Sequence, residues 1–216
     1  MMNNLFSVFD PCTGMLSMNW ISSFIFLMMM PTSLWVLNNK TTMLMKNIMS
    51  TLNTEMSMLM KYKGMTLISI SLFMLILWNN LMGLLPHVFT SSAHLIFSLS
   101  MALPLWMSLM LFGWINKTNS MFSHLVPNGT PGILMPFMVM IETISNLIRP
   151  GSLAVRLTAN MIAGHLLMSL LGNNYSTVML MLMMLVFLML MMFELAVAMI
   201  QSYVFMTLMT LYSSEI

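Results

Sequence analysis

The sequence predicts an all-α integral membrane protein that forms a single membrane domain over residues 1–216. Two observations lead to this fold class. Hydrophobic residues make up 59% of the chain and charged residues only 6%, against roughly 25% charged residues in a soluble domain. Apolar runs of about 18 residues or more also recur along the chain, and each can cross the hydrocarbon core of a bilayer as a helix.

Five apolar segments are expected to form membrane helices. The first three have the usual length and cover residues 20–37, 65–85 and 95–115. The last two, residues 133–171 and 176–212, are much longer. A straight helix over 133–171 would extend about 58 Å at ~1.5 Å per residue, whereas the hydrocarbon core is roughly 30 Å thick. We therefore expect both helices to be steeply tilted, and Gly-Asn-Asn at 172–174 predicts a tight hairpin turn between them.

Pro150 and Gly151 lie in the middle of the fourth apolar segment. Proline inside a helix removes a backbone hydrogen bond and breaks or kinks the helix. Two shorter spans joined by a solvated turn at Pro150 are therefore an alternative, but this turn would spoil the one-sided distribution of lysines. One long tilted helix, with a possible kink at Pro150, is the preferred interpretation.

Residues 38–64, between the first two apolar segments, mix charged residues with leucine and methionine. This pattern favours an amphipathic helix lying at the membrane interface, and a plain polar loop is the alternative. All five lysines fall in this segment or in the third connection, on one side of the membrane: Lys40, Lys46, Lys61, Lys63 and Lys117. With five crossings, the positive-inside rule predicts an outer N-terminus and an inner C-terminus.

Arg156 is the strongest candidate for a functional residue, because apolar sequence continues on both sides of it. Its guanidinium stays charged in a protein, and a charge inside the membrane is a functional hypothesis by default. Glu142, Arg149 and Arg156 follow one another at intervals of seven residues and so share one helix face. Arg149 is expected to reach towards the interface. Small and polar residues lie on or beside the same stripe: Asn146, Ser152, Asn160 and Ala163.

The last apolar segment repeats this pattern, since Glu194 and Gln201 are seven residues apart with Ala198 between them. Two such polar stripes on facing helices can enclose water. His165 lies nine residues after Arg156 and thus on the opposite side of its helix. Histidine titrates near neutral pH, as a proton relay requires. Taken alone, Asn160 or Gln201 would more simply be a structural hydrogen-bonding residue.

Other kinds of site are not expected. The four histidines lie on different segments without metal-ligand spacing: His87, His94, His124 and His165. Neither a nucleophile triad nor a phosphate-binding or dinucleotide motif is present, so no cofactor is expected. Cys12 is the single cysteine and can form no internal disulfide. A net charge of +2 does not indicate nucleic-acid binding.

Several motifs, in order along the chain, resemble the ATP synthase a chain family, and the mitochondrial form most closely. They are NNLMGLLPHVFTSS from Asn79, MALPLW from Met101, HLVPNGTPGILMPFMVMIETISNLIRP from His124, LTANMIAGH after Arg156 and MFELAVAMIQSYVF from Met192. The resemblance covers about residues 79–212. It implies a proton-translocating stator subunit of the membrane sector, whose two last helices form an inclined hairpin against a ring of c subunits.

In this family two half-channels carry protons to and from the ring carboxylates and couple proton flow to rotation and ATP synthesis. The resemblance implies that Arg156 faces the ring carboxylate and separates the half-channels, with Asn160 and Gln201 as its polar neighbours. His165 and Glu194 match the inlet half-channel, and Glu142 matches the acid of the outlet half-channel. Glu215 is left unassigned because it lies too close to the end of the sequence to align.

The resemblance also implies the surroundings of the chain. Its partners would be the c-ring, other membrane and peripheral-stalk subunits and membrane lipid, with protons as the transported ion. Nucleotide chemistry would lie in separate subunits, so that the isolated chain need not be an enzyme. The location would be the mitochondrial inner membrane, with the N-terminus in the intermembrane space and the C-terminus in the matrix.

Two other functions fit an intramembrane Arg, Glu and His. A secondary transporter usually shows internal repeats with interrupted helices, and neither is evident in this sequence. A purely structural assembly subunit would use Arg156 for assembly more than for proton flow.

Overall fold

A computed structural model describes residues 5–12, 16–31, 39–60, 63–85, 88–126, 129–173 and 180–215. All regular secondary structure in these residues is helical. Two 3-10 helices, η1 (Leu5–Phe9) and η2 (Met18–Phe24), precede the short helix α1 (Ile25–Met29). The remaining elements are α2 (Lys40–Leu59), α3 (Lys63–Gly83), η3 (Ser91–Ala93), α4 (Leu95–Asn116), α5 (Thr118–His124), α6 (Met135–Asn173) and α7 (Leu180–Glu215).

Within the described residues, four helices are long and apolar enough to cross a membrane: α3, α4, α6 and α7. They coincide with the predicted segments at 65–85, 95–115, 133–171 and 176–212. The first predicted segment, 20–37, differs. It begins as a 3-10 helix that passes into a five-residue α-helix, and residues 32–38 lie outside the described part. A membrane helix there stays a prediction.

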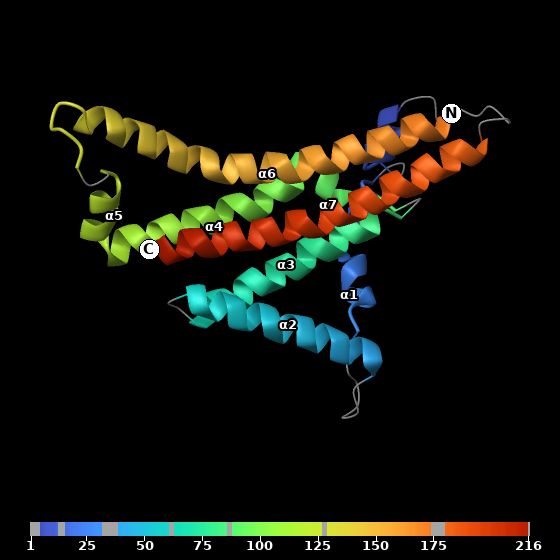
Figure 1. Cartoon of the computed structure of the whole chain (residues 1–216), viewed down its shortest axis with the longest axis horizontal. Helices are drawn as coiled ribbons and strands as arrows, with labels where there is room; N and C mark the ends of the chain where they lie inside the picture. The colour runs from blue at the N-terminus through green and yellow to red at the C-terminus, as the bar shows by residue number, and fades with distance from the viewer. Residues whose placement is uncertain are drawn as a thin grey trace.

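Helix α6 runs through Pro150 without interruption over 39 residues, so the alternative of two spans is wrong. Figure 1 shows α6 as one gently bowed helix, with α7 returning beside it in the opposite direction. The turn predicted at 172–174 was misplaced, because Gly172 and Asn173 still belong to α6. Helices commonly tolerate Gly and Asn near their C-terminal end, so this pair does not by itself end one. The connection falls within 174–179, outside the described residues.

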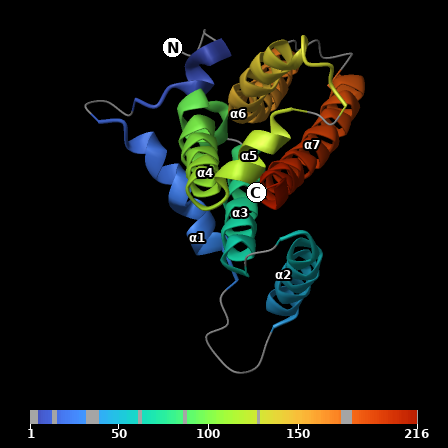
Figure 2. The same cartoon turned by 90° about the vertical axis from the view of Figure 1, so that its left-hand side faces the viewer.

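The four long helices share one apolar core, in which α3 packs along α7 and α4 packs along α6 (Figure 2). The main cluster takes residues from all four helices: Ile76, Ala102, Leu109, Leu153, Ala154, Leu157, Phe205 and Met209. Ala102 of α4 and Ala154 of α6 both belong to this cluster, and small residues of this kind allow helices to pack closely. This packing fixes which faces of α6 and α7 turn inward and which remain available for function.

Helix α2 confirms the predicted helix in 38–64 and lies to one side of the long helices (Figures 1 and 2). It buries Met56 against α3 and α7, in a cluster with Phe73, Met74 and Met206. On its other side, Met43 and Met58 are exposed. An apolar face that remains open suits a helix lying at a membrane interface, and that placement stays a prediction.

Candidate functional site

Arg156 lies on the open face of α6. The preceding Leu153 and Ala154 and the following Leu157 are buried in the core, whereas Arg156 itself is exposed. Its guanidinium makes no hydrogen bond or ion pair with any residue that the structure describes. The permanent charge therefore points away from its own chain and is open to a partner.

A narrow cavity of about 280 Å³ lies between α3, α6 and α7. Polar side chains from all three helices line it: Asn80 of α3, Asn160 of α6, and Glu194 and Gln201 of α7. Asn160 Nδ2 donates a hydrogen bond to Gln201 Oε1 over 3.3 Å, which joins the polar stripes of α6 and α7. The last part of the α6 stripe and the α7 stripe thus face each other across a cavity.

The carboxyl group of Glu194 is pressed against the backbone of α6 at Gly164. A Cβ atom at position 164 would lie 2.6 Å from Glu194 Cδ and 2.7 Å from Oε1, well inside van der Waals contact. Only glycine leaves room for the carboxyl group here. Oε1 of Glu194 is buried without a hydrogen-bond partner among the described residues, as are both amide atoms of Asn80. The cavity therefore contains polar groups to which water or a proton can bind.

His165 follows Gly164 and turns to a different side of α6. Its ring meets Phe9 of η1 edge-on, with 6.1 Å between the ring centroids. Its Nε2 is buried and has no hydrogen-bond partner in the described part of the chain. His165 is not among the residues that line the cavity, although its neighbour Gly164 is. The contact with Phe9 places the His165 ring on the side of the N-terminal segment.

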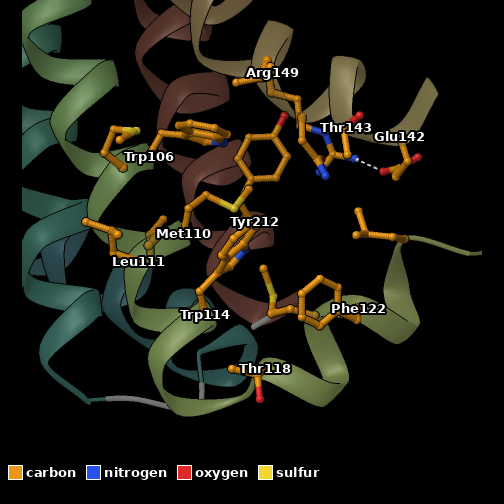
Figure 3. Close-up of a pocket in the computed structure, with 16 residues that line it drawn as sticks. Trp106, Met110, Leu111, Trp114, Thr118, Phe122, Glu142, Thr143, Arg149 and Tyr212 are labelled. Atoms are coloured by element: carbon orange, nitrogen blue, oxygen red, sulfur yellow. Dashed lines mark hydrogen bonds and ion pairs between the residues drawn. The ribbon is translucent and has the colours of Figure 1, made fainter. Parts of the chain in front are cut away.

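A second and larger cavity of about 670 Å³ lies among α4, α5, the first half of α6 and the end of α7 (Figure 3). Trp106 and Trp114 of α4 are among the residues that line it. On α6, Arg149 Nη2 lies 3.4 Å from Glu142 Oε1, and the Arg149 guanidinium sits over the Tyr212 ring at 5.0 Å. The sequence suggested that Arg149 reaches for the interface, but its guanidinium is held by this ion pair and cation–π contact.

The two cavities lie on opposite sides of Arg156 along α6. Arg149 precedes Arg156 by about 10 Å and Gly164 follows it by about 12 Å, at ~1.5 Å of helix rise per residue. The first half of α6 thus lines one cavity, and the second half lines the other. Arg156, exposed and without a polar partner among the described residues, thus lies between the two cavities, which we call the Glu194 chamber and the Glu142 chamber after the acids that line them.

The chain is similar to known proteins over its whole length. Residues 12–214 match the family model of the ATP synthase A chain. The chain is 56% identical to ATP synthase subunit a of Anopheles quadrimaculatus and of Drosophila melanogaster, and 53% identical to that of Locusta migratoria. Each of these alignments covers 100% of both chains. The chain belongs to the ATP synthase A chain family.

Membership in the ATP synthase A chain family establishes the general function. The chain is a multi-pass membrane protein and the proton-conducting stator subunit of an ATP synthase membrane sector. The alternative of a secondary transporter is therefore wrong. In the part of the chain that the structure describes, no three His, Cys, Asp or Glu side chains come together in a way that could hold a metal ion.

Three residues that line or contact the cavities were not predicted from the sequence. Gly164 could have been noticed as a helix-interior glycine between Asn160 and His165, where glycine costs stability without a packing reason. Asn80 lies in an apolar helix, and a polar residue there points inward. Tyr212 gave no signal, because tyrosine near a helix end is common at membrane interfaces.

Proposed function

We propose that the two cavities are the inner parts of two half-channels that serve the carboxylates of a rotating c-ring. The chamber around Glu194 would admit protons, and the chamber around Glu142 would release them. Arg156 would stand between them, opposite the ring. Proton flow then requires the ring to turn, which couples transport to ATP synthesis.

The physical basis is that lipid and Arg156 favour different protonation states of a ring carboxylate. In lipid a carboxylate must be protonated, because an unpaired charge in hydrocarbon costs far more than neutralisation. Beside a guanidinium the ionised form is favoured, so the carboxylate releases its proton there. The same positive charge repels a proton that would cross directly from one chamber to the other. Rotation is permitted and leakage is prevented.

The observation that carries this proposal is the position of Arg156. Its side chain is exposed, it makes no polar contact with the described residues, and it separates the two chambers along α6. A structural arginine inside a membrane domain would be expected to pair with its own chain. An arginine that must meet a succession of passing carboxylates has to remain unpaired when the ring is absent.

The roles of the other residues follow from their chambers. Glu194 would be the last proton carrier of the inlet before the ring, with His165 supplying it from the side of η1. Asn160 and Gln201, joined by their hydrogen bond, would hold the water that reaches Arg156. Glu142 would accept the released proton in the outlet chamber. The side chain of Glu215 lies outside the described residues, so no role is proposed for it.

The surroundings of the chain are proposed from the same family. We propose a location in the mitochondrial inner membrane, with the N-terminus and inlet facing the intermembrane space and the C-terminus facing the matrix. The whole chain would form one membrane domain, with α2 at the interface. Side chains are largely exposed in the first half of α7, as the region 181–193 illustrates. This surface suits contacts with the ring, with other subunits and with lipid.

The deciding experiment compares Arg156→Ala with Lys40→Ala in the assembled ATP synthase. Both remove one positive charge, but Lys40 lies at the start of α2, outside both chambers. We expect Arg156→Ala complexes to contain an intact ring and to show no proton-driven ATP synthesis, while Lys40→Ala complexes work normally. Normal synthesis by Arg156→Ala complexes would overturn the proposal. Loss of the ring from the complex would favour a structural role for Arg156.

A further inference from the structure

The N-terminal 3-10 helix η1 packs against α6 next to the Glu194 chamber. Its last residue, Phe9, packs against an apolar cluster with members from α6, α7 and the connection between α3 and α4: Leu84, Ala93, Met161 and Ala198. Met161 and Ala198 of this cluster also line the chamber. Phe9 therefore lies against the wall of the Glu194 chamber, although it does not line the chamber itself.

Phe9 contacts His165 on this side of α6. Ile162, His165 and Met168 follow one another at intervals of three residues and are therefore neighbours on the helix surface. Ile162 and Met168 pack against the same cluster as Phe9. The His165 ring meets the Phe9 ring edge-on, with an interplanar angle of 86°. Edge-to-face contact is a favourable arrangement of two aromatic rings, so this contact favours one orientation of the imidazole.

No hydrogen bond competes with this contact among the residues that the structure describes. The imidazole of His165 makes no hydrogen bond or ion pair with any of them, and its Nε2 is buried. A histidine ring is often oriented by a hydrogen bond to one of its nitrogens, and that nitrogen is then occupied. Phenylalanine has no side-chain donor or acceptor, so Phe9 can orient the imidazole and leave both nitrogens available to protons.

The chain is held in place directly after Phe9. Asp10 Oδ1 accepts a hydrogen bond from the Cys12 backbone N–H over 3.1 Å, which closes a local turn. The Asp10 backbone N–H donates to the Ser7 carbonyl over 3.3 Å, and the Asp10 carbonyl accepts a bond from Asn19 Nδ2 over 3.1 Å. These bonds tie η1 to the segment that follows it, so the Phe9 ring is presented to α6 from a defined backbone position.

We propose that Phe9 is a positioning residue for proton transfer, whose ring sets the orientation in which the His165 imidazole exchanges protons with the Glu194 chamber. The inference rests on the proposed inlet role of His165. A group that transfers protons must be held in the right geometry, and a freely rotating imidazole would spend only part of its time there. Phe9 restricts that rotation by contact with its ring edge and takes no part in the transfer itself.

Proton-driven ATP synthesis by assembled complexes tests this role with Phe9→Leu and Phe9→Tyr. Leucine keeps an apolar side chain against the cluster but has no aromatic ring, whereas tyrosine keeps the ring. We expect Phe9→Leu to lower the rate about fivefold, or ~1 kcal/mol, which is the usual contribution of an aromatic pair. Phe9→Tyr should retain most of the rate. Phe6→Leu is the matched control, because Phe6 belongs to the same helix and is 68% exposed.

A double variant separates positioning from simple packing. If Phe9 acts through His165, adding Phe9→Leu to His165→Gln should lower synthesis no further than His165→Gln alone. The same fivefold loss in both backgrounds, or loss of the chain from the complex in Phe9→Leu, would show a packing role and overturn the inference. Normal synthesis by Phe9→Leu, with reduced synthesis by His165→Gln, would refute the positioning role alone. Normal synthesis by His165→Gln would instead refute the proposed inlet role of His165.

Discussion

The two chambers on either side of Arg156 differ in how they treat charge. Around Glu194 the space is narrow, the carboxyl oxygen Oε1 is buried, and it makes no polar contact with described residues. Around Glu142 the space is more than twice as large, and the carboxylate pairs with Arg149 at 3.4 Å. Oε1 of Glu194 has no hydrogen-bond partner in the described part of the chain, whereas Glu142 is 37% exposed and forms an ion pair with Arg149.

This difference suits opposite ends of a proton path. In the proposed function, the acid that delivers protons to the ring must exchange a proton with water, and Glu194 Oε1 has no hydrogen-bond partner among the described residues. In the same proposal, the acid that accepts protons released beside Arg156 is Glu142, which lies in the larger cavity and pairs with Arg149. The asymmetry of the cavities therefore fits the proposed assignment of Glu194 to the inlet and Glu142 to the outlet.

Among changes inside the two chambers, the largest effect is expected from Glu194→Gln. The amide keeps the size of the side chain but cannot carry a proton, and no other acid lines this chamber. We expect proton-driven ATP synthesis to fall by about 100-fold, the usual contribution of a positioned proton-transfer group. The measurement is ATP synthesis by assembled complexes in sealed vesicles. A fall no larger than that of Glu142→Gln would abolish the distinction between the chambers.

Gly164→Ala is expected to have the second largest effect, and only on the Glu194 chamber. The added methyl group would meet Glu194 Cδ at 2.6 Å, so the carboxyl group must move. Overpacking of this kind costs typically ~1–3 kcal/mol, and we expect synthesis to fall about tenfold. Adding Glu194→Asp shortens the acid and makes room for the methyl group.

The double variant should therefore work better than Gly164→Ala alone, as a coupling between contacting residues requires. Ala163→Ser serves as the matched control, because it adds one atom to the neighbouring exposed residue. Independent, additive losses from Gly164→Ala and Glu194→Asp would show that the close packing does not govern this site.

The contrast between the chambers also shows what the sequence could and could not predict. The long helices followed from uninterrupted apolar length, which depends on composition alone. The stripes of Glu142 and Arg149, and of Glu194 and Gln201, followed from helical spacing. Their grouping into two separate chambers did not, because it depends on how α4 and α3 pack against α6 and α7.

Helix boundaries were the least predictable part of the fold. Gly172 and Asn173 read as a turn, but residues of this kind are also accommodated in the last turn of a helix, as in α6. Pro150 did not break α6, because packing against the core can offset the lost hydrogen bond, and Pro150 is buried. Local propensity failed at these positions because tertiary packing decided the outcome.

Glu142→Gln should reduce synthesis less than either change at the Glu194 chamber. Its carboxylate is 37% exposed, so water in the larger cavity can take over part of its task. We expect a fall of about threefold, corresponding to ~0.7 kcal/mol at 1.36 kcal/mol per factor of ten. Thr143→Val, which changes a neighbouring residue of the same wall, is the control. A complete loss of synthesis in Glu142→Gln would mean that the outlet acid is as indispensable as the inlet acid.

The smallest effect is expected from Tyr212→Phe. The Arg149 guanidinium sits over the face of the Tyr212 ring at 5.0 Å, and a phenylalanine ring preserves this contact. Synthesis should therefore change by less than about twofold, whereas Tyr212→Ala removes the ring and should resemble loss of the Glu142–Arg149 pair. If Tyr212→Phe proved as damaging as Tyr212→Ala, the hydroxyl would be a proton carrier of the outlet chamber. Proton transfer in the Glu142 chamber would then depend on the Tyr212 hydroxyl as well as on the Glu142–Arg149 ion pair.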